Sequence, residues 1–213
     1  MVRIPEQHDW VIFCILGCIF LYIFSFNVIY RNATIKDFLT IQKEEASNIV
    51  LSWMLTSFVF CIMLAVNLSQ FLPATPQFLS EYTLYGYKLN KIGFTVLSLF
   101  SFYFVKNLLT YIYYSTLGYN KLLINLYLIA NKLYFLGSLV LMASSFAFFF
   151  FPIDSVYFLY ILFGLCLFMF ITKLISYFFN TTKTLPFEWY YKILYICTLQ
   201  IVPLLVLTKF LFY

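Results

Sequence analysis

Six long stretches without a charged residue divide this chain, and apolar side chains dominate each of them. They are residues 10–30, 46–80, 92–105, 133–153, 155–172 and 193–208. A helix needs about 20 apolar residues to cross the roughly 30 Å hydrocarbon layer of a bilayer, and most of the stretches are that long. The pattern therefore predicts an all-α fold, a polytopic transmembrane helix bundle of about six spans with short loops.

Prolines, charges and aromatic residues at the ends of these stretches set the predicted boundaries. We expect one transmembrane domain with spans at residues 10–30, 49–71, 92–114, 132–151, 156–178 and 189–212. Pro73 and Pro76 end the second span, because proline cannot continue the hydrogen-bond ladder of a helix. The segment 121–132 also looks helical and is expected to feed into the fourth span. Pro152 and Asp154 predict a tight turn, so the fourth and fifth spans run antiparallel.

The start of the chain does not have the pattern of a removable signal peptide. Only one basic residue, Arg3, precedes the first apolar stretch, which is longer than a typical signal-peptide core. It also lacks a cleavage site of small residues. We therefore expect residues 10–30 to be a permanent span.

The most hydrophilic segment, residues 31–48, joins the first two spans. Thr34 followed by Asp37 resembles a helix capping box, with Asp in place of Glu. Apolar residues that include Phe38 then fall on one helical face. This predicts a cytoplasmic loop with a short amphipathic helix at the membrane surface. A cytoplasmic extension of a span is the alternative.

Composition and charge support a membrane protein and argue against nucleic-acid binding. Charged residues make up 10% of the chain, whereas a soluble domain carries about 25%. The net charge of +5 is too small and scattered for a nucleic-acid footprint. The odd-numbered loops and adjoining span ends hold Arg31, Lys36, Lys43, Lys106, Lys121, Lys132, Lys173, Lys183 and Lys192, against Arg3, Lys88, Lys91 and Lys209 on the other side. The positive-inside rule then places the odd loops in the cytoplasm and both termini outside, in the periplasm of a Gram-negative cell.

Nothing in the chain has the spacing of a catalytic or metal-binding motif. HExxH, GxSxG and P-loop patterns are absent, and all eight acidic residues lie in loops or at span ends. A proton-coupled transporter usually needs an intramembrane acid. The cysteines Cys14, Cys18, Cys61, Cys166 and Cys197 fall in predicted spans, where free cysteine packs as a small hydrophobe. We expect no enzyme activity, no cofactor, no metal and no disulfide.

Lys106 is the most unusual polar residue, because it falls inside the third predicted span. Fourteen residues separate it from Lys91, about 21 Å of helix at 1.5 Å per residue. Tyr103, Asn107, Thr110 and Tyr114 lie on the same or an adjacent helical face, and could form a polar stripe with Lys106. An ionisable group inside the membrane suggests a functional site. The alternative, which we prefer, is a lysine that reaches the interface or fixes packing against a carbonyl or a partner subunit.

The sixth span holds a second polar position. Gln200 precedes Pro203, which leaves the carbonyl of Leu199 without its usual donor. Gln200 or a neighbouring helix is expected to satisfy that carbonyl, since unpaired backbone groups are costly in lipid. A kink with a polar patch would be a subunit contact or a binding site, or it would only hold the helices together.

Other polar residues near span ends have a simpler interpretation. Asn131 and Lys132 open the predicted fourth span, and Lys173 closes the fifth. Long cationic side chains at such boundaries extend to the membrane surface. We expect these residues to anchor the spans, and we expect the only histidine, His8, to be solvated beside Asp9.

The chain resembles one family from residues 8–10, His-Asp-Trp, to the closing segment at residues 191–207, YKILYICTLQIVPLLVL. It is similar to the integral membrane proteins of Bacteroidota grouped as domain-of-unknown-function family 4271. Members typically close with Leu-Tyr-Leu-Cys-Ala-Leu-Glu-Ile-x-Pro, and Lys106 also matches the basic residue of their third span. This chain has Gln200 where the family often has Glu. The resemblance therefore implies a hydrogen-bonding, assembly role for that position rather than carboxylate chemistry.

The family carries no activity, so function rests on the residues. The leading hypothesis is a non-catalytic subunit of the inner (cytoplasmic) membrane that binds or scaffolds another envelope protein complex. Its lineage makes the secretion and gliding machinery a candidate host, and its partner would be a membrane protein or a second copy. The alternative is a small transporter or channel for an anion or small polar solute, lined by Lys106 and Gln200. A membrane enzyme acting on lipid or isoprenoid has the least support, since Glu44 and Glu45 form the only acidic pair.

Overall fold

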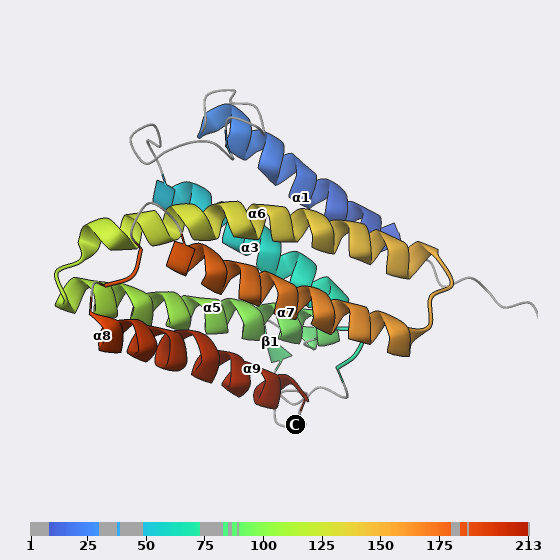
Figure 1. Ribbon diagram of the computed structural model, residues 1–213. Coiled ribbons are helices and arrows are strands. Elements are labelled where there is room, and N and C mark those ends of the chain that lie inside the picture. Colours follow the sequence, from blue (N-terminus) through green and yellow to red (C-terminus); the bar gives the residue numbers. More distant parts are fainter. Residues whose placement is uncertain are drawn as a thin grey trace, which may run out of the picture.

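Long helices whose axes are roughly aligned, parallel or antiparallel, make up the computed structural model (Figure 1). It describes residues 9–29, 38, 49–72, 83–84, 87–88, 90–179, 184–186 and 188–212. The helices are α1 (Asp9–Val28), α3 (Ile49–Leu68), α5 (Lys91–Thr116), α6 (Asn120–Phe150), α7 (Ser155–Phe179), α8 (Trp189–Leu194), the π-helix η1 (Tyr195–Ile201) and α9 (Val202–Phe212). Two short strands, β1 (Thr83–Leu84) and β2 (Tyr87–Lys88), pair antiparallel in the connection from α3 to α5.

The predicted fold class is confirmed. In the described ranges, six helices are long and apolar enough to cross a membrane, the sixth being the continuous segment Trp189–Leu211 that contains α8, η1 and α9. Helix α6 begins at Asn120, so the helical segment expected before the fourth span is part of one long helix. The amphipathic helix expected in residues 31–48 lies outside the described residues, apart from Phe38, which is buried against Phe26 and Phe135.

Large apolar side chains cover the outward faces of the bundle. Phe13 on α1 is 72% exposed, Phe104 on α5 is 62% exposed and Phe168 on α7 is 65% exposed. Soluble monomers rarely present broad apolar surface of this kind. Helices that are hydrophobic all round, as these are, suit contact with lipid acyl chains. The chain is therefore a multi-pass membrane protein.

Helices α3 and α6 pack along each other and form the centre of the bundle. Thr56 and Ser52 of α3 both hydrogen bond to the side chain of Asn131 of α6. Farther along the same interface, Nδ2 of Asn67 donates to the carbonyl oxygen of Leu141 at 3.3 Å. Inside a bilayer, such polar contacts take the place of the hydrophobic effect in joining helices.

Helices α1 and α7 pack against α6 by different means. Tyr22 of α1 donates its hydroxyl to Ser138 of α6, and its ring lies edge-on to Phe135 at 5.0 Å. Helix α7 approaches α6 at Gly137, where a Cβ atom would lie 1.8 Å from Cε of Met169. Glycine at this position therefore allows Met169 to lie directly against the α6 backbone.

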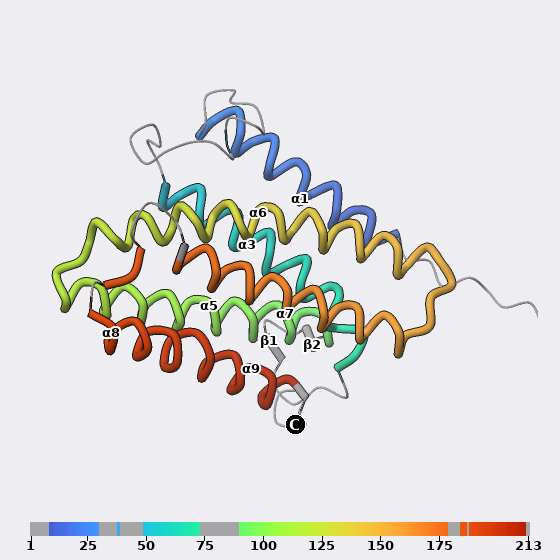
Figure 2. The backbone as a smooth tube through the Cα atoms, in the orientation of Figure 1, coloured from blue at the N-terminus to red at the C-terminus, as the bar shows by residue number. Residues whose placement is uncertain are grey.

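A tight turn makes α5 and α6 antiparallel neighbours. Gly118 adopts φ 72°, a left-handed conformation that glycine adopts without a steric penalty. The N–H of Tyr119 bonds to the carbonyl of Tyr114 at 2.9 Å, and that of Gly118 to Ser115 at 3.1 Å, as in a Schellman motif. Figure 2 shows the last span returning alongside α5. This places η1 beside the middle of α5.

Candidate functional site

Lys106 lies in α5 and extends to the last span. Its ammonium group donates a hydrogen bond of 2.8 Å to Oε1 of Gln200. The lysine side chain is half-buried. One turn later, the buried Thr110 donates its hydroxyl to the carbonyl of Lys106 at 2.9 Å. Helix α5 thus presents polar groups at one-turn spacing to the segment that contains Gln200.

Gln200 is positioned by the π-helix η1. Its Nε2 atom donates to the hydroxyl of Tyr195, five residues earlier, at 2.9 Å. At 3.6 residues per turn, residues five apart in an α-helix lie about 140° apart around the axis. Bonding from residue i to i+5 widens the turn and brings them to one side. The N–H of Val202 makes such a bond to the carbonyl of Cys197.

Pro203 explains why the helix is widened at this point. It has no N–H group, so it cannot make the α-helical bond to the carbonyl of Leu199. The sequence predicted a kink with a polar patch, and the structure has a π-helical segment that ends two residues before Pro203. Gln200 makes its described side-chain bonds to Lys106 and Tyr195, not to the Leu199 carbonyl.

A second lysine, Lys173 of α7, lies in the same group of side chains as Lys106 and Gln200. Its ammonium group donates to the hydroxyl of Tyr134 at 2.8 Å. It also lies 4.8 Å from the centre of the Tyr134 ring and 5.8 Å from that of Tyr177. Aromatic faces attract cations at such distances. The sequence had assigned Lys173 to a membrane-surface anchor, whereas the fold turns its ammonium group onto two tyrosines of the bundle.

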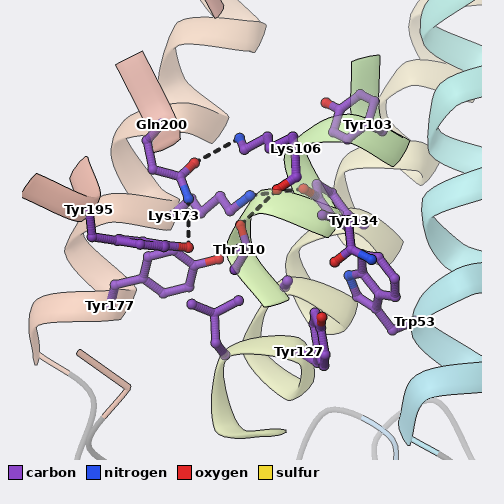
Figure 3. Close-up of a pocket in the computed structure, with 13 residues that line it drawn as sticks. Trp53, Tyr103, Lys106, Thr110, Tyr127, Tyr134, Lys173, Tyr177, Tyr195 and Gln200 are labelled. Carbon is purple, nitrogen blue, oxygen red and sulfur yellow. Dashed lines mark hydrogen bonds between the residues drawn. The ribbon is translucent and has the colours of Figure 1, made fainter. Parts of the chain in front are cut away.

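These side chains surround a small cavity between α3, α5, α6, α7 and η1. Figure 3 shows Lys106 and Gln200 directed toward each other, and Lys173 beside them with its ammonium group directed to Tyr134. The cavity has a volume of about 30 Å³. Its lining consists of Trp53, Tyr103, Lys106, Asn107, Thr110, Leu126, Tyr127, Ala130, Tyr134, Lys173, Tyr177, Tyr195 and Gln200.

The structure brings together most of the polar residues singled out from the sequence. Tyr103, Lys106, Asn107 and Thr110 of α5 line the cavity with Gln200. Two other residues singled out from the sequence, Pro203 and Tyr114, do not line the cavity. Pro203 acts on the cavity through the shape of the last span, and Tyr114 is fully buried with its hydroxyl bonded to the carbonyl of Thr184 at 2.9 Å.

Comparison with known proteins identifies the family of the chain. The family model described as Domain of unknown function (DUF4271) matches residues 10–211. The chain belongs to this family. No curated protein and no solved structure matches it.

The lining of the cavity in this DUF4271 protein, in the part of the chain that the structure describes, combines two lysines with no Asp or Glu. The acceptors beside the lysines are already in use. Oε1 of Gln200 accepts from Lys106, and the hydroxyl of Tyr134 accepts from Lys173. A buried charge is stable only when it is paired or well hydrogen-bonded, so the site is suited to a negatively charged group.

Eight of the thirteen residues that line the DUF4271 site were not predicted. Four of the eight, Tyr134, Lys173, Tyr177 and Tyr195, had a simpler interpretation in the sequence. Lys173 and Tyr177 stand near the end of the predicted fifth span, where cationic and aromatic residues commonly meet the membrane surface. Tyr134 and Tyr195 belong to a tyrosine-rich chain, and nothing in their spacing distinguishes them. The only local signal was Pro203, since a proline inside a span predicts irregular backbone bonding near Tyr195.

The described residues give no support for a metal centre. They contain no group of three or more His, Cys, Asp or Glu side chains arranged to hold an ion. Cys18 and Cys61 are buried, Cys18 within an apolar cluster, and all five cysteines are free thiols. The polar groups that line the cavity are ammonium, hydroxyl and amide groups.

Proposed function

We propose that this DUF4271 protein is a non-catalytic subunit of a membrane complex, which binds another membrane protein through the cavity at Lys106, Lys173 and Gln200. The observation that carries this proposal is the lysine pair without a carboxylate among the cavity residues. A charge in the centre of a bilayer costs roughly 2.5–3.5 kcal/mol on insertion scales. An acidic side chain on a partner helix would offset that cost.

The acidic residues of the chain that the structure describes are poorly placed to do this. Asp9 opens α1, Asp154 precedes α7 and Glu188 precedes α8, so the described acids stand at the ends of spans. Gln200, in contrast, lies midway along Trp189–Leu211. A carboxylate on a partner helix can reach that depth, because its helix crosses the same layer.

The location and host of the complex are part of the proposal. The residues of the last span that resemble those of Bacteroidota proteins support the inner membrane of such a bacterium. The excess of basic residues in the odd-numbered loops and adjoining span ends supports both termini in the periplasm. The same resemblance makes the secretion and gliding machinery a candidate host. The lack of catalytic motifs in the sequence supports a subunit that binds rather than transforms its partner.

Purification of the tagged full-length chain from native membranes in mild detergent tests the proposal. The mass of the purified particle, measured by native mass spectrometry, should exceed that of the 25.3 kDa chain by a constant amount. Lys106→Met should reduce the complex to the single chain. Lys209→Met, at an exposed lysine near the end of α9, is the matched control and should leave the complex intact. A single chain from wild-type membranes, or equal loss in both variants, would reject the proposal.

A small transporter or channel for an anion remains the second candidate, because the cavity itself is lined by two cations. A transporter or channel would be recognised by anion flux across the membrane rather than by a stable complex. Purified protein in liposomes should then release a small anion faster than protein-free liposomes do. Lys106→Met should abolish the difference, and unchanged flux in this variant would exclude the cavity as the conduction path.

A further inference from the structure

Tyr177 is a cavity residue with an unused hydrogen-bond donor. Its side chain is 4% exposed, and its hydroxyl has no hydrogen-bond partner among the described residues. Figure 3 shows the hydroxyl beside Tyr195 and directed toward the group of side chains that includes Lys173. A buried hydroxyl without a partner costs roughly 1–3 kcal/mol in proteins. Its persistence here points to an acceptor that occupies the cavity.

The neighbouring polar groups have more donors than acceptors. Each lysine ammonium carries three N–H groups, and Lys106 and Lys173 each use one in a described hydrogen bond. The amide of Gln200 carries two and uses one, toward Tyr195. With Tyr177, four separate groups therefore have a donor to spare.

The acceptors closest to the lysines and to Gln200 are occupied at the same time. The hydroxyl of Tyr195 accepts from Gln200, and Oε1 of Gln200 accepts from Lys106. The hydroxyl of Thr110 donates to the carbonyl of Lys106. The bond to Tyr195 orients Gln200 so that its oxygen faces Lys106 and leaves one N–H free. A ligand that completes the site must accept hydrogen bonds and carry negative charge.

We propose that the cavity is a binding site for a single carboxylate, held by Lys106, Lys173, Gln200 and the hydroxyl of Tyr177. A carboxylate has two oxygens and about four lone-pair positions, which matches the four groups with a spare donor. This deepens the proposed function, on which it rests, by naming the chemistry of the partner's contact.

The cavity has room for the two oxygens of one carboxylate. A water molecule requires roughly 10–15 Å³ measured in this way, so about 30 Å³ accommodates two oxygen-sized atoms. The tyrosine faces against Lys173 offset part of the second positive charge, so that one negative charge is sufficient.

Tyr177→Phe gives the sharpest test, because it removes only the hydroxyl that no described bond uses. The wild-type chain in nanodiscs is titrated with formate at constant ionic strength, and its unfolding temperature is recorded. A ligand that binds the folded state raises this temperature in a saturable manner. Tyr177→Phe should raise the half-saturating formate concentration about 10-fold or more, since bonds to charged groups are worth roughly 1.5–3 kcal/mol. Tyr160→Phe on the same helix, 70% exposed, is the matched control and should behave as wild type.

Gln200→Glu tests the charge argument independently. The new carboxylate would stand where Oε1 now accepts from Lys106, so the chain would supply its own ligand. The variant should remain folded and lose the saturable response to formate. A wild-type protein that shows no saturable response, or a Gln200→Glu variant that responds as wild type does, would overturn the carboxylate site. A response to phosphate that exceeds the response to formate would also overturn it.

A second arm distinguishes a free carboxylate from a side chain of a partner. A leucine-rich transmembrane peptide with one central Glu is compared with the same peptide carrying Gln, in the same nanodiscs. If the proposed function is correct, the Glu peptide should bind, compete with formate and lose affinity in Tyr177→Phe. Formate binding without preference for the Glu peptide would leave the carboxylate site standing and reject the partner-binding function.

Discussion

Thr56 of α3 donates a hydrogen bond of 2.6 Å to the side-chain oxygen of Asn131 of α6. The amide nitrogen of Asn131 donates in turn to the hydroxyl of Ser52 at 2.9 Å. All three residues are at most 3% exposed. They form a closed polar bridge between the two central helices, where neither water nor lipid could replace the contacts.

Asn131→Ala should therefore destabilise the folded bundle. The variant loses both interhelical bonds, and such bonds are worth about 0.6–2 kcal/mol each in membrane proteins. Reversible unfolding in mixed micelles would measure the change in the free energy of unfolding. Asn120→Ala, at the exposed first residue of α6, is the control and should change little. Equal effects of the two substitutions would show that the bridge contributes nothing.

Gly118→Ala should also destabilise the protein, through the backbone rather than through packing. Gly118 has φ 72°, and left-handed geometry costs other residues roughly 1–2 kcal/mol. No atom lies within 4 Å of the position that its Cβ would take, so a clash cannot explain the loss. Thermal unfolding in detergent measures the effect.

Gly164→Ala is the control for that substitution. Gly164 lies in α7 with equally open surroundings but without positive φ. Alanine in a helix interior is favoured over glycine by roughly 0.5–1 kcal/mol, so this variant should be neutral or more stable. The same sign of change at both glycines would contradict the assignment of strain to Gly118.

The fold and part of the candidate site follow from local features of the sequence. Six apolar stretches predict six membrane-spanning helices without any knowledge of their packing. Lys106 and Gln200 stand out because an ionisable or amide side chain inside a span is costly wherever the helix is placed. That cost predicts that each needs a partner. It does not predict that they are partners of each other, 94 residues apart.

The rest of the site depends on tertiary packing that the sequence does not encode locally. Lys173 near a span end is compatible with a surface anchor, and only the position of Tyr134 on α6 shows that it points inward. Asn131 looked like the start of a span, whereas α6 begins eleven residues earlier and buries it against α3. The unused hydroxyl of Tyr177 depends on what all its neighbours bind, so no property of its own segment reveals it.

The double variant Lys106→Met/Gln200→Leu should be at least as stable as the wild type. Replacing a buried ionic contact with hydrophobic residues is often stabilising by about 1–4 kcal/mol. Each single variant should instead be destabilised, because it leaves the other polar group without its partner, at a cost of roughly 1–3 kcal/mol. Unfolding free energies of the four proteins form a cycle whose coupling term measures the contact. A double variant less stable than both singles would show that these residues hold the bundle together and are not retained for binding.

Pro203→Ala should remove that coupling without changing any residue that lines the cavity. Alanine restores the N–H that can bond to Leu199, so the last span can revert from η1 to a regular α-helix. Gln200 would then turn away from Tyr195, since residues five apart no longer share a face. The Lys106–Gln200 coupling, about 1.5–3 kcal/mol in the wild type for a bond to a charged group, should fall toward zero in the Pro203→Ala background. Val206→Ala, at an exposed position one turn later on α9, should leave the coupling unchanged. A coupling that survives Pro203→Ala would mean that the π-helix does not depend on the proline.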